Sequence, residues 1–426
     1  MTYRDRAAGT AAAGKWPWWS FLFAMSISMS LFGFLVVGAY ADSHGLGVTR
    51  GLSLVLRYGA GMIILGLLFS REWRQAGGEV ATAAKLGLLF VFYYGLQIYI
   101  KTLFPTVELL LPWYEYEGYF LLFCVLPYLI TLQARRHSDF EMLYWWLIAL
   151  LVVVLVIYWS SYSSFKEENT QSLRFRPFES VNPIKLVYAS LAASTLAAWR
   201  VIVGKPGVVM KGVLIVIVIS GLMLSLLGGQ RQVVLSLVLT VGLFVILVRK
   251  SRKRGDSSAV FRFFLIFVVL ALVVSMTIDM YEGTMTRLTE TKDSVETGSE
   301  GRFGLWKEAI DVFLKNPIVG GGVQLPVGGS YPHNAILEAF MVSGIAGGAL
   351  FIWYFLLSLK LAYRVAVTSD YGWVGIFHWQ VAISSLFSGA LYSNEWYWIS
   401  SGLTISALRL DRRIKRRRMR RKKQSA

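Results

Sequence analysis

Long apolar stretches recur along the chain, and within them apolar residues run continuously instead of alternating with polar ones. A helix needs about 20 mostly apolar residues to cross a bilayer, whereas the strands of a membrane barrel alternate. The pattern therefore predicts an all-α, polytopic membrane protein with about 12 transmembrane helices. The predicted spans cover residues 18–40, 51–70, 83–100, 118–133, 142–160, 184–203, 212–228, 232–248, 260–280, 334–360, 373–391 and 394–408.

Two apolar segments differ from an ordinary span. The segment 102–113 is too short to cross a bilayer and contains Pro105, Glu108 and Pro112, so we expect it to be re-entrant or interfacial. In the first span, residues 39–41 (Ala-Tyr-Ala) fit a signal-peptide cleavage pattern, but the apolar stretch exceeds the usual length. We interpret this span as an uncleaved first helix.

Composition supports the membrane interpretation. Hydrophobic residues make up 55% of the 426 positions and charged residues only 16%, against about 25% charged residues in soluble globular proteins. These proportions exclude a soluble enzyme, a disordered chain and a fibrous protein. The single cysteine, Cys124, excludes a disulfide framework and a multi-cysteine metal site.

The net charge of +18 is concentrated at one end, because residues 409–423 hold eleven Lys/Arg and one Asp. A basic tail beside a span usually marks the cytoplasmic side and contacts anionic lipid, so we expect no nucleic-acid binding. Twelve spans then place both termini in the cytoplasm, with 409–426 as a basic tail. Cytoplasmic ends would hold 30 Lys/Arg and external ends 12, as the positive-inside rule requires.

In this topology two long loops face outward, at residues 161–183 and at 281–333, between the ninth and tenth helices. The cytoplasmic connections are short, and the chain has no phosphate-binding loop and no acidic pair for a metal–nucleotide sugar. We therefore expect a single transmembrane domain, 1–426, whose chemistry takes place on the external side.

Arg231 is the first candidate site residue. It follows Gly228 and Gly229 and opens the eighth span on the external side, where helix N–H groups and the helix dipole favour an anion. An arginine there could bind a phosphate. The alternative is an interfacial arginine that reaches back to water.

The external segment 301–314 contains the second candidate, Arg302. Its apolar residues share one face at helical spacing, which predicts an amphipathic helix at the membrane surface that stops at Pro317. A guanidinium fits a phosphate better than an ammonium does. A solvated surface charge is the alternative. The apolar face consists of Phe303, Trp306, Ile310, Phe313 and Leu314.

A glycine-rich loop at 320–329 leads to His333 at the external mouth of the tenth span. Asn334 is a predicted N-cap, and Glu338 would lie one turn into the span. A carboxylate there is costly and often functional, but pairing with Arg231 or Arg302 is an equally good interpretation. His333 itself could be structural. His44, His137 and His378 lack a comparable context.

The other external loop contains Arg174 and Arg176 among aromatic residues. Such a face could hold a sugar ring and a phosphate, and a plain solvated loop is the alternative.

Together these residues resemble the O-antigen ligase and O-antigen polymerase superfamily. The matching features are Arg231 with Leu235, Arg302 with Trp306, Asn316-Pro317 before Gly320-Gly321-Gly322, and His333-Asn334 followed by Gly344-Ile345-Ala346-Gly347. The resemblance is strongest over residues 300–362, with support near Arg231. The first half of the chain agrees only in its number of spans and its external loop.

The resemblance implies a metal-independent glycosyltransferase of the bacterial inner membrane, which acts on its periplasmic face and needs no cofactor. The donor would be an undecaprenyl-pyrophosphate-linked oligosaccharide. Polymerases transfer the glycan to a second carrier-linked repeat unit, and ligases transfer it to lipid A–core. The segment from Tyr331 to Glu338 looks more like the polymerases and related exopolysaccharide enzymes. Other envelope polysaccharide assembly proteins would be partners.

The residues suit this chemistry. Arg231 and Arg302 could stabilise the pyrophosphate in place of a metal ion, and His333 could take the proton of the acceptor hydroxyl. The direction of the pKa shift of His333 stays open at this point, since nearby carboxylates and arginines oppose each other. Substrate-binding candidates are Arg174, Arg176, Tyr331, Asn334 and Glu338.

Two other functional classes remain possible on the sequence alone. Twelve spans are common in transporters and flippases, although intramembrane charges that would line a path are scarce here. A non-catalytic scaffold of an envelope assembly would use the external loops for docking. Lengthening of a lipid-linked glycan by the purified protein separates all three classes.

Overall fold

A computed structural model of the chain describes residues 17–43, 78–161, 183–204, 206–227, 231–252, 301–327 and 331–424, together with short helical pieces within 59–67. Every regular element in these ranges is a helix. The prediction of an all-α, polytopic membrane protein is therefore confirmed. Within the described ranges six helices are long and apolar enough to cross a membrane: Trp18–Ala39, Glu79–Leu103, His137–Ser160, Ile184–Val203, Val208–Leu227 and Ala335–Thr368.

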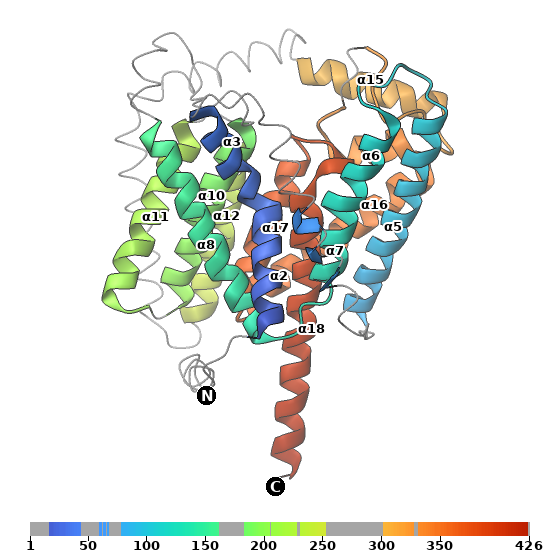
Figure 1. The fold of residues 1–426 in the computed structure, drawn as a ribbon. Helices are drawn as coiled ribbons and strands as arrows, with labels where there is room; N and C mark the ends of the chain where they lie inside the picture. The colour runs from blue at the N-terminus through green and yellow to red at the C-terminus, as the bar shows by residue number, and fades with distance from the viewer. Residues whose placement is uncertain are drawn as a thin grey trace. The chain divides into compact units, whose positions relative to one another are not determined.

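The total of twelve spans stays a prediction. The predicted span 260–280 and most of 51–70 lie outside the described residues, as do the loop 162–182 and residues 281–300. The helices group into two compact units. The first unit comprises residues 1–70, 134–230 and 240–281, and the second comprises 71–133, 231–239 and 282–426 (Figure 1). The single transmembrane domain, 1–426, also remains a prediction.

The first unit contains α2 (Trp18–Ser28), a π-helical turn (Met29–Gly33), α3 (Phe34–Ser43), α8 (His137–Ser160), α10 (Pro183–Val203) and α11 (Val208–Leu227). Helices α2 and α10 both pack against α8, and α10 also packs against α11. The buried carboxylate of Asp139 stabilises the start of α8. It accepts hydrogen bonds from Ser20 Oγ at 2.6 Å and from the backbone amide of Arg135 at 2.8 Å, so the apolar unit contains no uncompensated charge at this point.

The second unit contains Arg302 and His333. Its helices are α5 (Glu79–Leu103), α6 (Trp113–Tyr119), a π-helical turn (Phe120–Val125), α7 (Leu126–Thr131), α15 (Gly301–Lys315), α16 (Ala335–Thr368), α17 (Gly372–Ser385), the 3₁₀ turn η3 (Leu391–Ser393) and α18 (Glu395–Gln424). Helix α16 packs against α5, α15, α17 and α18. Helix α12 (Arg231–Arg252) lies partly in each unit.

Helix α16 is broken near its start. Gly344 has φ +63° and ψ −165°, a backbone conformation that is essentially restricted to glycine. The break frees the backbone amide of Ile345, which donates to the carbonyl oxygen of Pro317 at 2.8 Å, while Gly321 N donates to Met341 O at 2.8 Å. The loop after α15 therefore fills the break and separates a short half-helix, 335–343, from the long remainder of α16.

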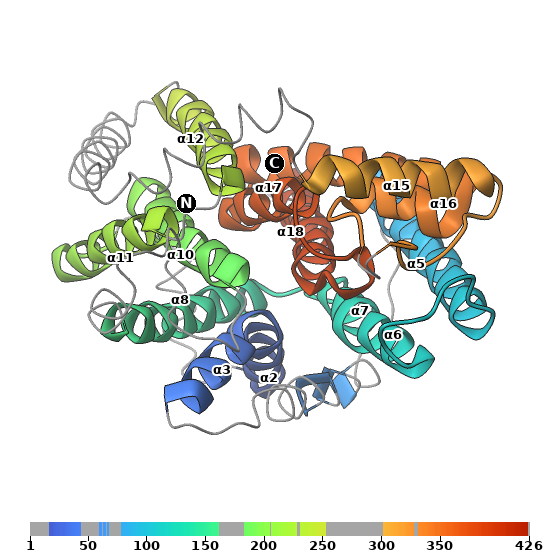
Figure 2. The same cartoon turned by 90° about the horizontal axis from the view of Figure 1, so that it is seen from above.

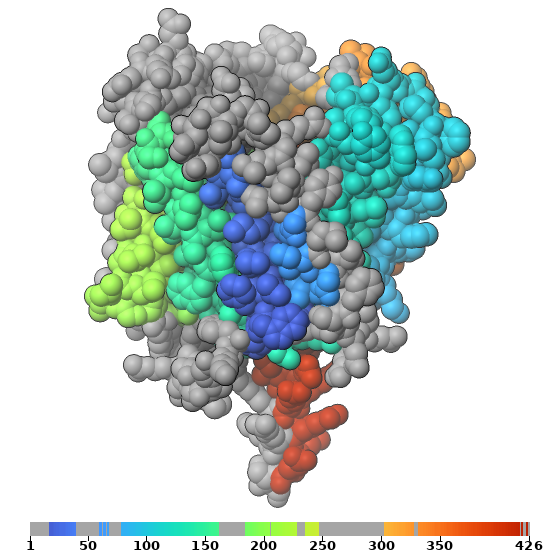
Figure 3. All heavy atoms as spheres, in the orientation of Figure 1, coloured from blue at the N-terminus to red at the C-terminus, as the bar shows by residue number. Residues whose placement is uncertain are grey.

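The last two helices differ from the predicted spans. Helix α17 ends at Ser385 instead of reaching residue 391, because the chain leaves the helix and turns at Gly389 with φ +79°. Helix α18 instead continues as one helix through the basic tail to Gln424. Figures 1 and 3 show this basic part of α18 extending past the end of α5.

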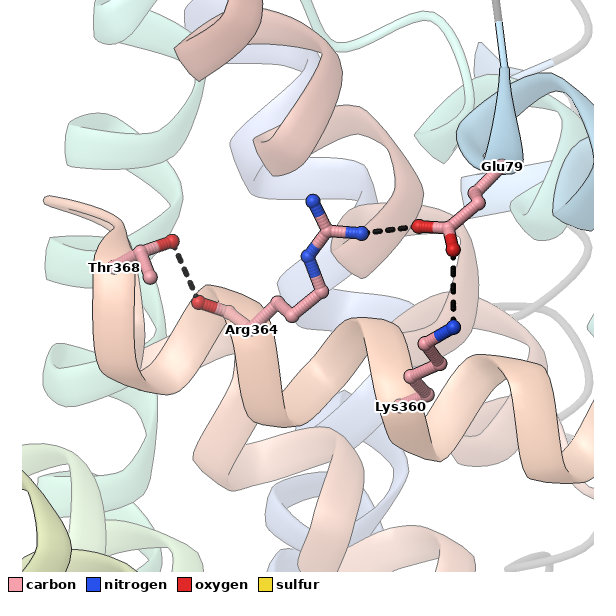
Figure 4. Close-up of polar contacts among 4 residues, drawn as sticks. All are labelled: Glu79, Lys360, Arg364 and Thr368. Atoms are coloured by element: carbon pink, nitrogen blue, oxygen red, sulfur yellow. Dashed lines mark hydrogen bonds and ion pairs between the residues drawn. The ribbon is translucent and has the colours of Figure 1, made fainter.

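Ion pairs connect α5 and α16 at the end of the second unit where α5 begins. Glu79, the first residue of α5, accepts a hydrogen bond from Lys360 Nζ at 3.0 Å and another from Arg364 (Figure 4). These side chains are largely exposed, so the pairs add little to stability. Thr368 Oγ1 donates to the Arg364 carbonyl one turn later, at 2.8 Å.

At the opposite end of the second unit, α5 ends and α6, α16 and α18 begin. Helix α15 packs on α16 and lies crosswise at this end (Figures 1 and 2). The segment 102–113, for which we expect a re-entrant or interfacial position, joins α5 to α6 here. Thr106 Oγ1 donates to Gly321 O at 3.2 Å, and Leu110 N donates to Gln324 Oε1 at 2.9 Å. The loop after α15 is thereby held in place beside the candidate site.

Candidate functional site

His333 lies in the short segment between the glycine-rich loop and α16. Its φ of +54° is the only positive φ of a non-glycine residue among those that the structure describes. Such a conformation costs free energy and persists where the surrounding contacts impose it, often at functional sites. The imidazole is partly buried and its ring centroid lies 4.6 Å from that of Tyr331.

Asn334 caps α16 directly after His333. Its side-chain oxygen accepts hydrogen bonds from the backbone amides of Ile336 at 3.0 Å and Leu337 at 3.1 Å. This is the geometry of an N-cap, as the sequence predicts. Because the side-chain oxygen is engaged in capping, Asn334 fixes the backbone beside the imidazole; its role in binding substrate stays a prediction.

Arg302 is the second residue of α15, and its charge acts on His333. One turn further along, Trp306 Nε1 donates to the backbone carbonyl of Pro332 at 2.9 Å. Helix α15 is therefore joined directly to the residue before His333. The structure thus brings Arg302 and His333, two of the three residues assigned to catalysis, into one site.

The predicted apolar face of α15 is divided. Phe313 packs edge to face on Phe340 of α16, with ring centroids 5.2 Å apart. Phe303, Ile310 and Leu314 are instead exposed. The helix therefore presents an apolar strip beside the residues of the site.

The surroundings of His333 lower its pKa. Burial of the imidazole disfavours its charged form, and the nearby guanidinium of Arg302 has the same effect. The imidazole consequently remains neutral at neutral pH, and a neutral imidazole can accept a proton.

Glu338 does not pair with Arg302. Its carboxylate is fully buried in the first turn of α16, where Oε1 accepts from Tyr94 Oη and Oε2 from Leu391 N, each at 2.8 Å. Both partners are neutral donors from other elements of the second unit. Glu338 is thus out of reach of a substrate, although the sequence makes it a candidate for binding one.

Tyrosines surround this carboxylate, and sequence reasoning found only one of them. Tyr331 and Tyr392 pack edge to face with centroids 6.5 Å apart, and Tyr116 packs against Tyr392 at 5.2 Å. Burial raises the pKa of Tyr331 and Tyr392, and the charge of Glu338 raises it further, so both phenols stay protonated. The sequence signal that could have identified Tyr392 is its position on the external side, between the last two predicted spans.

The remaining candidates lie where the structure describes little. Arg231 is the first residue of α12, as the sequence predicts, but its side chain is outside the described part of the chain. Arg174 and Arg176 also lie outside the described residues. Their role in binding substrate stays a prediction.

The described helices include six that could cross a membrane. With α15 lying across one end of the second unit and the partly buried His333 next to Arg302 there, they define a membrane protein with a candidate site at that end. Residues 213–352 match the protein family described as O-Antigen ligase. This stretch runs from α11 past the break in α16 and contains Arg231, Arg302 and His333. This part of the chain, about a third of its length, is thus similar to the O-antigen ligase family, in agreement with the resemblance that the sequence motifs indicate. No curated protein matches the sequence.

Proposed function

We propose that this protein transfers glycan from an undecaprenyl-pyrophosphate carrier to a second carrier-linked repeat unit, as an O-antigen or exopolysaccharide polymerase. The observation that carries the proposal is the meeting of His333 and Arg302 inside the matched family domain, beside the exposed apolar strip of α15. A donor with a charged pyrophosphate and a long hydrocarbon chain requires a cationic group and an apolar surface close together.

The proposed reaction is a single displacement at the anomeric carbon of the donor glycan. An acceptor hydroxyl attacks this carbon, the bond to the pyrophosphate oxygen breaks, and His333 takes the hydroxyl proton. The electron pair of the broken bond remains on the pyrophosphate, where Arg302 and Arg231 stabilise the added charge. The arginines make a divalent metal ion unnecessary in this scheme, and no cofactor takes part.

The site faces the periplasm in this proposal, and the protein lies in the bacterial inner membrane. Support comes from the second unit, where the basic extension of α18 leaves at the end opposite to α15 (Figure 1). Since basic segments remain in the cytoplasm, the end with His333 faces outward and the C-terminus faces inward. The even number of predicted spans puts the N-terminus on the same side in this proposal.

Ligation of the glycan to lipid A–core is the second candidate function, because the matched family is described as O-Antigen ligase. The donor half of the reaction would be the same. Only the acceptor differs, and the acceptor decides between the two functions.

Purified protein in lipid nanodiscs tests the proposal directly. We expect a lipid-linked repeat unit alone to yield a ladder of longer lipid-linked glycans, in the presence of a chelator as well. Product formed only when lipid A–core is added would establish the ligase instead. Activity with a nucleotide sugar and no lipid-linked substrate, or strict dependence on added Mg²⁺ or Mn²⁺, would contradict the scheme.

Replacing Arg302 by alanine is expected to lower turnover at least about 100-fold, the scale of losing one preorganised charge-stabilising donor. Arg231→Ala should have a similar effect. Lysine at either position should restore only part of the rate, because an ammonium cannot form the two parallel bonds of a guanidinium.

Lys307→Ala is the matched control, since it removes an exposed cation from the same helix as Arg302. We expect it to leave turnover unchanged. Turnover is measured per folded protein, from the rate of ladder formation. A correctly folded Arg302→Ala protein with the wild-type rate would remove Arg302 from the site.

A further inference from the structure

Glu338 ties three elements of the second unit together. It belongs to the first turn of α16, its Oε1 accepts from Tyr94 of α5, and its Oε2 accepts from the backbone amide of Leu391 in η3. A buried carboxylate is costly unless its oxygens are hydrogen-bonded. Here both oxygens are, and each donor comes from a different element.

The η3 turn is also held from two other sides. Trp398 Nε1 donates to the carbonyl of Leu391 at 3.2 Å, and the thiol of Cys124 donates to the carbonyl of Tyr392 at 3.2 Å. All of these groups are buried. The position of Tyr392 therefore depends on a small set of buried hydrogen bonds, of which the bond from Leu391 N to Glu338 Oε2 connects η3 to α16.

Tyr392 in turn supports the residues beside the imidazole. Its ring packs edge to face on Tyr331, and the ring of Tyr331 lies 4.6 Å from that of His333. Tyr116 packs on Tyr392 at 5.2 Å. Because His333 has a strained backbone, its conformation requires neighbours that leave it no alternative. The rings of Tyr331 and Tyr392 are such neighbours.

We propose that Glu338 is a positioning residue for His333, which acts by holding η3 so that Tyr392 and Tyr331 fix the imidazole. This inference rests on the proposed function, in which His333 is the base. The side chain of Glu338 touches neither substrate nor the reacting atoms in this role. Its contribution is geometric, and a displacement of about 1 Å at a reacting group can lower a rate on the order of 100-fold.

Glutamine can replace the glutamate in such a role. Its amide oxygen can accept from Leu391 N, and its NH₂ group can donate to the oxygen of Tyr94, because a phenol both donates and accepts. Methionine has a similar length but offers no comparable acceptor. Glu338→Gln should therefore retain the position of η3, whereas Glu338→Met should release it.

The first measurement is turnover per folded protein for these two variants. We expect Glu338→Met to lower kcat roughly 10- to 100-fold with little change in KM for the lipid-linked donor, because Arg302 is untouched. Glu338→Gln should restore kcat to within about threefold of wild type. Wild-type kcat in folded Glu338→Met protein would overturn the proposal, and so would a Gln variant as slow as the Met variant.

A double-mutant cycle tests the route through Tyr392. Tyr392→Ala should lower kcat by about the same factor as Glu338→Met, and the double variant should be no slower than either, because both changes break the same connection. If the two losses of kcat multiply in the double variant, the two residues act independently, and Glu338 does not act on His333 through Tyr392. If Glu338→Met does not fold, the other two variants still test the proposal. Wild-type kcat in Tyr392→Ala would overturn it, and so would a large loss of kcat in Glu338→Gln.

Tyr354→Phe is the matched control for loss of a buried hydrogen bond on α16. It removes the bond from Tyr354 Oη to Ser401 Oγ, and Tyr354 contacts neither η3 nor His333 through any bond that the structure describes. We expect lower thermal stability with unchanged kcat. A loss of kcat as large as that of Glu338→Met would show that any weakening of the bundle slows the reaction.

Hydrogen exchange separates this inference from the proposed function. In Glu338→Met, peptides covering 388–394 and 331–334 should exchange faster than in wild type, whether or not the protein transfers glycan. If wild type is inactive but exchange changes as expected, the proposed function fails and the positioning contact stands. Unchanged exchange in both peptides would overturn the contact itself.

Discussion

Substitution of His333 by alanine is expected to lower turnover by about 100- to 10,000-fold, the usual range for loss of a general base. The imidazole is held next to Arg302 and Tyr331 at the start of α16. Donor binding should largely survive, because the arginines that contact the pyrophosphate in the proposed scheme are unchanged. Turnover and donor affinity of the purified variant are measured separately.

The pH dependence gives a second test of the same role. Burial and Arg302 both lower the pKa of His333, so the imidazole stays neutral to lower pH than a free histidine. The rate should therefore fall on acidification only below the ordinary histidine value of about pH 6.5. In Arg302→Ala the residual rate should fall at a higher pH than in wild type, since one cause of the lowered pKa is gone.

His333→Gln distinguishes a base from a hydrogen-bonding residue. Glutamine can form hydrogen bonds but cannot take the proton, so we expect it to be as slow as alanine. His137→Ala is the matched control, because it removes another partly exposed histidine, at the start of α8 in the first unit. Wild-type turnover of the Gln variant would exclude His333 as the base.

The helices and the N-cap were predictable because their causes are local. Apolar runs of sufficient length form helices in a membrane whatever they pack against. Asn334 caps α16 because its side-chain oxygen reaches the backbone amides two and three positions further along, those of Ile336 and Leu337. Such contacts depend on residues a few positions apart, and the sequence displays them directly.

The environment of Glu338 was not predictable in the same way. The sequence left two interpretations of Glu338 open: a functional carboxylate, or a partner of Arg231 or Arg302. The donors are instead Tyr94, 244 positions away, and the amide of Leu391, 53 positions away. A backbone amide has no sequence signature, and its availability here depends on α17 ending at Ser385 and the chain turning into η3.

The break in α16 also depends on distant residues. The run 334–360 is mostly apolar and predicts one continuous span. Glycines at 344 and 347 fit tight helix packing equally well. Only the tertiary contact between Ile345 N and Pro317 O shows that Gly344 leaves the helical conformation. The break explains why Asn316-Pro317 and Gly344 occur together in one motif: they are two sides of the same contact.

Gly344→Ala is accordingly expected to destabilise the protein severely. A Cβ atom at this position would lie 2.1 Å from Ile318 O and 2.7 Å from Val319 N, and both are backbone atoms. The backbone conformation adds roughly 1–3 kcal/mol of strain for any residue with a side chain, and overpacking typically adds about 1–3 kcal/mol. We expect a loss of stability of about 3 kcal/mol, seen as a lower apparent Tm and a lower yield of folded protein in detergent.

Gly212→Ala provides the matched control, because no atom lies within 4 Å of the Cβ it would add to α11. Alanine is also the better helix former, so we expect wild-type or slightly higher stability. Any Gly344→Ala protein that folds should still be slow in glycan transfer. The half-helix 335–343 includes Glu338 and follows His333, so a shift at the break moves both relative to α15. An unchanged Tm in Gly344→Ala would mean that α16 is continuous in solution, and the loop after α15 would then lack the backbone contacts that place it beside the site.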